Sequence, residues 1–75
     1  MELHELAGLV ERPDVHRRIV GDYAGPYSLS VTHSPTGPAF VLKVRDARGF
    51  PNRVTIEGQD IPIIVQGGFL PPRPL

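Results

Sequence analysis

The sequence predicts an α+β domain in which a kinked N-terminal helix, or a helix pair, packs on a three- to four-stranded antiparallel sheet in two layers. Apolar residues recur at helical spacing before residue 25 and alternate with polar residues after it. Glycine and proline separate these stretches. The chain has 75 residues and no cysteine, so we expect one small domain without disulfides over residues 1–68, followed by a tail, 69–75.

Residues 2–23 form the predicted helical region. Leu3, Leu6 and Leu9 recur with the period of a helix and are separated by glutamates. Pro13 either kinks this helix or begins a second one, because proline is tolerated in the first turn and disrupts the interior. Gly21 marks the end of the second stretch.

Two hairpins are predicted after the helical region. Strands over 27–33 and 39–46 flank a turn rich in proline and glycine, and strands over 53–57 and 61–66 flank a second tight turn. Pro62 has no N–H to donate, so we expect it at a sheet edge or with its missing donor facing outward. Phe50, in the loop between the hairpins, is expected to close one end of the core.

One face of the sheet is predicted to face solvent because its side chains are polar. It carries basic residues, which give a candidate nucleic-acid surface made of Lys43, Arg45, Arg48 and Arg53. This surface has no interleaved aromatic residue, and the chain has 8 basic and 8 acidic residues and no net charge. Nucleic-acid binding is therefore the less favoured alternative.

No residue pattern predicts catalysis, a metal site or a cofactor. His4 and His16 are not at the spacing that places two ligands on one helix face, and His33 and Ser34, as strand neighbours, point to opposite faces. Gly67-Gly68 lacks the remaining residues of a phosphate-binding loop. We expect no enzymatic activity, no bound metal and no cofactor.

The C-terminal segment is the most unusual feature, since it is both apolar and proline-rich. It either folds back on the core or docks in the groove of a protein partner as a pre-extended peptide. Self-pairing of edge strands into a homodimer is a third alternative. The candidate partner-binding residues are Pro62, Phe69, Leu70, Pro71, Pro72 and Arg73.

The N-terminus carries glutamates where a signal peptide carries basic residues, and no apolar run is long enough to cross a membrane. We therefore expect a cytoplasmic protein that does not interact with membranes. Because the sequence begins with Met1, we expect a complete small gene product.

Two segments, SPTGPAFVLKV at 34–44 and FPNRVTIEGQDIPIIV at 50–65, resemble the small non-catalytic region that precedes the protease domain in some bacterial trypsin-like peptidases. In that region a PTG-x-PA turn leads into an apolar strand and an I-D-G-V-P-V-x-V hairpin follows. Here the second motif has one extra residue in its turn. The resemblance covers about half of the chain and implies a small bacterial-type accessory module with no catalytic residue of its own. We expect a non-enzymatic protein that acts by protein–protein interaction.

Overall fold

The computed structural model describes residues 2–70 and contains two helices and four strands. The predicted helical region is a pair of short helices, α1 (Leu3–Leu9) and α2 (Pro13–Val20). Pro13 occupies the first turn of α2, where no backbone donor is needed. The second helix ends at Gly21, whose φ of 62° lies in a region that favours glycine. The alternative of a helix pair is therefore the one that the chain adopts.

Both predicted hairpins are present, with tighter turns than expected. The first joins β1 (Tyr27–Ser34) to β2 (Gly37–Val44), and the second joins β3 (Arg53–Ile56) to β4 (Gln59–Gln66). In the second turn Glu57 and Gly58 have positive φ values of 53° and 78°, as in the turns that match the twist of paired strands.

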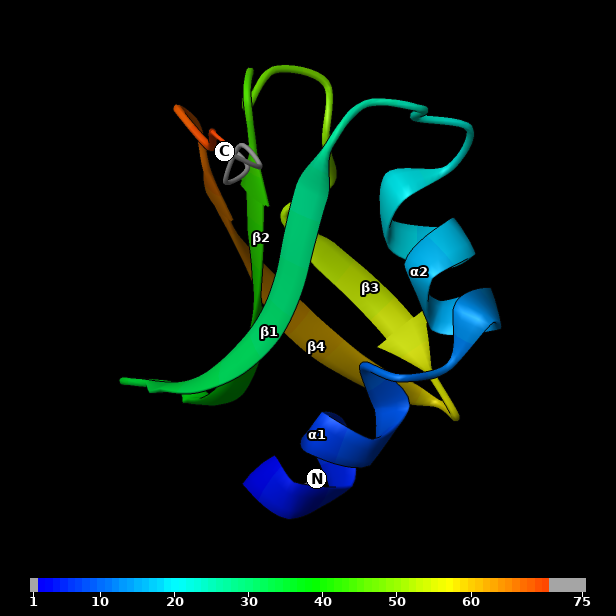
Figure 1. Ribbon diagram of the computed structural model, residues 1–75. Helices are drawn as coiled ribbons and strands as arrows, with labels where there is room; N and C mark the ends of the chain where they lie inside the picture. Colours follow the sequence, from blue (N-terminus) through cyan, green and yellow to red (C-terminus); the bar gives the residue numbers. More distant parts are fainter. Residues whose placement is uncertain (1, 71–75) are drawn as a thin grey trace, which may run out of the picture.

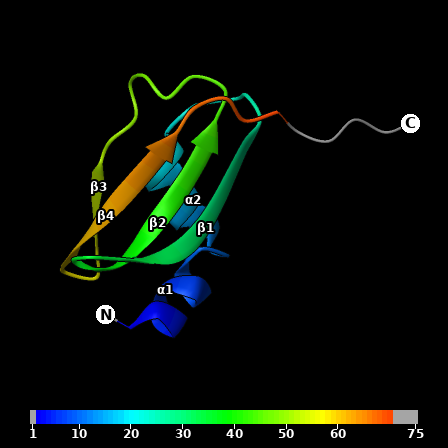
Figure 2. The same cartoon turned by 90° about the vertical axis from the view of Figure 1, so that its left-hand side faces the viewer.

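The sheet is mixed, which corrects the prediction of an antiparallel sheet. Its strand order is β1-β2-β4-β3, and the two hairpins meet through a parallel pairing of β2 with β4. The loop after β2 passes the end of β4 to reach the far edge (Figure 2), so β4 returns between β2 and β3 in the sheet (Figure 1). Alternation of side chains predicts strands and faces, whereas strand order depends on how the hairpins pack together.

Of the two placements expected for Pro62, the sheet edge is wrong, because β4 is an interior strand. The parallel ladder begins at the pair Phe40–Ile63, directly after Pro62. Pro38 lies just before the same point on β2. The two prolines therefore stand where the ladder stops, so neither interrupts it.

The helices cover one face of the sheet, and Figure 2 shows the opposite face toward the viewer with α2 behind it. This confirms the two-layer α+β arrangement. Helix α1 packs on β1 and β2, and α2 packs on β3. Ten side chains from both helices and from β2, β3 and β4 form the core: Leu6, Leu9, Val15, Ile19, Phe40, Leu42, Val44, Ile56, Ile61 and Ile63.

Phe50 packs against this core and meets the Tyr23 ring edge-on, with 5.2 Å between the ring centroids. Phe50 therefore belongs to the core, which is the part of its expected role that these contacts show. His16 joins the helices to β1: its Nε2 contacts the Val10 carbonyl, and its Nδ1 lies 2.8 Å from the Tyr27 hydroxyl. The carbonyl can only accept a hydrogen bond, so Nε2 carries the hydrogen.

Candidate interaction surface

The first candidate surface, the edge formed by β1, is eight residues long. It contains no lysine, arginine, aspartate, glutamate or proline. Natural edge strands are commonly shortened, charged or interrupted by proline, because unpaired backbone groups attract other strands. Figure 2 shows β1 along one margin of the sheet, and no other described strand pairs with its outer side.

Pro38 determines which backbone groups of β1 face outward. His33 pairs with Pro38, which has no N–H, so this pair cannot be one of the hydrogen-bonded pairs of the antiparallel ladder. Hydrogen-bonded and non-hydrogen-bonded pairs alternate along such a ladder. The backbone groups of four alternate residues therefore point away from β2: Tyr27, Leu29, Val31 and His33.

The side chains of β1 are also less covered than those of its neighbour. Tyr27, Leu29 and Val31 lie on the same face as Val44, Leu42 and Phe40, with which they pair. The three β2 side chains have no exposed surface, while the three β1 side chains are only half-buried against the core. The β1 edge therefore combines free backbone groups with a row of incompletely covered apolar side chains.

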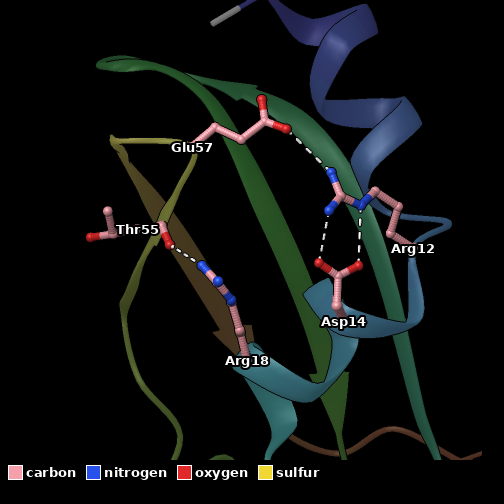
Figure 3. A network of polar contacts seen from close by, with 5 residues as sticks. All are labelled: Arg12, Asp14, Arg18, Thr55 and Glu57. Atoms are coloured by element: carbon pink, nitrogen blue, oxygen red, sulfur yellow. Dashed lines mark hydrogen bonds and ion pairs between the residues drawn. The ribbon is translucent and has the colours of Figure 1, made fainter.

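The opposite edge, β3, has four residues and begins with Arg53. Arg53 pairs with Pro62, so by the same reasoning Arg53 and Thr55 direct their backbone groups away from β4. Thr55 is not free: the Arg18 guanidinium of α2 donates a hydrogen bond to its carbonyl at 3.0 Å (Figure 3). A helix side chain thus occupies one of the two outward positions of this edge.

A second contact secures the same side of the molecule. The Arg12 guanidinium binds both oxygens of Asp14, at 2.8 and 3.1 Å, and reaches Glu57 in the β3–β4 turn at 3.2 Å (Figure 3). The hydrogen bond from Arg12 holds the pKa of Asp14 below its ordinary value of 3.8. Arg12 thereby links the helical layer to the hairpin that contains β3.

The open face of the sheet is less polar than predicted. Val41 and Ile64 pair across the parallel ladder on this face, and they are 9% and 37% exposed. The alternation of side chains along β2 puts Val41 on the same face as Lys43, and the pairing of β2 with β4 brings Ile64 beside it. Pro62 is half-buried and lies on the same face of β4 as Ile64.

The predicted partner-binding tail is described only in part. The Phe69 N–H donates to the Val44 carbonyl at 2.9 Å and the Gly68 N–H to the Arg45 carbonyl at 3.0 Å, so the chain stays beside the end of β2. Phe69 is half-buried, while Leu70 is 76% exposed. Pro71, Pro72 and Arg73 lie outside the described residues.

The basic residues proposed for nucleic acid do not form one free cluster. Arg48 pairs with Asp46 at 2.8 Å and Arg53 with Asp60 at 2.7 Å. Arg48 also lowers the pKa of Asp46 by hydrogen bonding to its carboxylate. Lys43, on β2, and Arg45, just after it, are exposed. Two of the four positive charges are therefore neutralised locally.

Other parts of the described chain offer less for a ligand. A cleft of about 450 Å³ lies between the end of α2 and the loop before β3, and its walls include Arg18, Tyr23 and Phe50. Within residues 2–70 no group of three or more histidines and carboxylates could hold a metal ion. No helix of these residues is long and apolar enough to cross a membrane.

Comparisons with protein-family models, curated proteins and solved structures found no match to this chain. The resemblance to the region before bacterial trypsin-like protease domains therefore stays a prediction. The β1 edge is the feature that sequence reasoning did not place, because the strand order decides which strands are edges. The signal available in the sequence was a long predicted strand, 27–33, that has no charged residue and no proline.

Proposed function

We propose that the protein is a non-enzymatic interaction module that binds an extended protein segment by adding it as a strand to the edge of β1. The observation that carries this proposal is the difference between the two edges of one sheet. Thr55 on β3 is capped by Arg18, whereas the outward groups of β1 face no other strand among the described residues. Strand addition is a common way to recognise extended peptides.

The proposal accounts for both the backbone and the side chains of β1. An added strand satisfies the outward N–H and C=O groups of residues such as Leu29 and Val31. Its own side chains cover the half-buried row on the helix-facing side of the sheet. Main-chain bonds would supply affinity, and the hydroxyl side chains of Ser28, Ser30 and Thr32 on the open face would supply selectivity.

The experiment removes one outward N–H without removing a bond to β2. Val31→Pro deletes an outward donor, and Val31→Ala is the matched control, which shortens the same side chain and keeps the donor. Peptides selected from a displayed random library against the wild-type protein should bind Val31→Ala comparably and bind Val31→Pro at least tenfold more weakly, the size expected for one lost hydrogen bond and a steric clash.

Folding of Val31→Pro is checked by its amide spectrum, which should keep the dispersion of the wild-type protein. Equal peptide binding by Val31→Pro and Val31→Ala would contradict the proposal. A library that yields no peptide for the wild-type protein would contradict it as well.

A further inference from the structure

The sequence of β1 is self-complementary when two copies run antiparallel. We propose that the strand added to β1 is β1 of a second copy, which joins two four-stranded sheets into one eight-stranded sheet. This inference rests on the proposed use of the β1 edge and names its partner. The pairing is centred on Ser30, which lies opposite itself across a two-fold axis.

This register pairs like with like on both faces. Around the axis, Leu29 lies opposite Val31 on the helix-facing side, and Ser28 lies opposite Thr32 on the open face. Aliphatic pairs and pairs of hydroxyl residues are among the favourable cross-strand neighbours. The half-buried Leu29 and Val31 of each copy are then covered by those of the other.

The same register satisfies the backbone. Leu29 and Val31 both direct their N–H and C=O groups outward, as the alternation set by Pro38 requires. In the proposed pair they face each other and exchange both hydrogen bonds. A slip by one residue opposes an outward residue to an inward one, which breaks the ladder and reverses the faces.

A register centred on Val31 keeps the alternation but sets His33 opposite Leu29. The register centred on Ser30 sets His33 opposite Tyr27 instead. Both registers use seven residues of β1, but the register centred on Ser30 forms four pairs that exchange hydrogen bonds, against three, and it keeps the aliphatic side chains together.

Charge and shape allow this arrangement. The only ionisable side chains of β1 are the Tyr27 phenol and the His33 imidazole. Two copies of the strand therefore meet without repulsion between charged side chains. Figure 1 places α1 toward the end of the sheet where β1 leads into the β1–β2 turn. A two-fold axis at Ser30 sets the two α1 helices at opposite ends of the joined sheet.

The test places charges at the axis, because Ser30 is exposed and tolerates substitution. Sedimentation of the full chain over a range of concentrations should show a dimer. Ser30→Lys and Ser30→Glu should each weaken association about fivefold, since like charges then lie directly opposite. A mixture of the two variants should form heterodimers at least as tightly as the wild type. Matched controls are Thr55→Lys and Thr55→Glu, which put the same charges on β3 and should leave association unchanged.

Val31→Pro removes two equivalent hydrogen bonds per dimer and should weaken association about a hundredfold. Wild-type protein that stays monomeric while library peptides bind at Val31 would overturn the dimer and leave the proposed function standing. A dimer that Val31→Pro does not weaken uses another surface, and it overturns the inference. Equal association of all Ser30 mixtures would overturn the register.

Discussion

The two edges of this sheet differ in length, in charge and in what covers them. The β3 edge is four residues long, begins with Arg53 and has one of its outward carbonyls bound by Arg18. The β1 edge is twice that length and has four outward positions that no other described strand pairs with. A few side chains, such as Arg53 and Arg18, are enough to protect the β3 edge. The uncovered β1 edge is the basis of the proposed binding role.

The same difference extends to the side chains under each edge. Under β3, Ile56 is 3% exposed and Val54 is half-buried, whereas under β1 Tyr27, Leu29 and Val31 are all half-buried. This contrast predicts that Ile56 contributes more to the free energy of unfolding than Leu29 does, and substitutions at these two positions test it.

The largest expected effect is at Ile56. Ile56→Ala should lower the free energy of unfolding by about 3 kcal/mol, because it opens a cavity in the core that also contains Ile61 and Ile63. Leu29→Ala should lower it by about 1 kcal/mol in dilute protein, since only part of that side chain leaves water. Urea unfolding of both variants measures the difference. Equal losses would show that β1 is as well covered as β3.

A pair of proline variants tests which groups of β1 face outward. Ser30→Pro should destabilise the fold by about 2 kcal/mol more than Val31→Pro, because the Ser30 N–H faces β2 and the Val31 N–H faces away. Urea unfolding of dilute samples of both variants measures this difference. A larger loss for Val31→Pro would reverse the assignment and remove the basis of the proposed binding edge.

Local patterns in the sequence predicted the elements well, and the structure shows why. The alternation from Tyr27 onward defines the hairpins, and Pro13 defines the start of α2. The turns came out shorter than predicted because Pro38 and Gln59 pair within strands. Proline favours turns, but the missing donor of Pro38 falls at a non-hydrogen-bonded pair of the hairpin, so Pro38 fits within β2.

Strand order was not predictable by the same reasoning. The parallel pairing of β2 with β4 depends on contacts between residues more than twenty positions apart, such as Phe40 and Ile63. No periodicity in either strand encodes that choice. Since strand order decides that β1 is an edge and β4 is not, the sequence pointed to Pro62 and the tail, and it did not identify the β1 edge.

A smaller effect is expected where Arg18 caps β3. Arg18→Ala removes the donor to the Thr55 carbonyl and should lower the free energy of unfolding by about 0.5–1 kcal/mol, as for an ordinary exposed hydrogen bond. The control is Arg17→Ala, an exposed arginine on the same helix. Urea unfolding distinguishes them, and equal effects would mean that the capping contact does not stabilise this edge.

The smallest effect is the pH dependence of the Arg12–Asp14 pair. Arg12 holds the folded-state pKa of Asp14 below 3.8, so the carboxylate stabilises the fold fully above that value. This contribution is lost as the pH falls through the lowered pKa. Asp14→Asn should remove that part of the acid dependence, while the part due to Asp46 remains. Because Arg12 also holds Glu57, protonation of Asp14 should loosen the β3–β4 turn before it affects β1. Amide signals followed during acid titration test this order, and earlier changes at Leu29 than at Gly58 would contradict it.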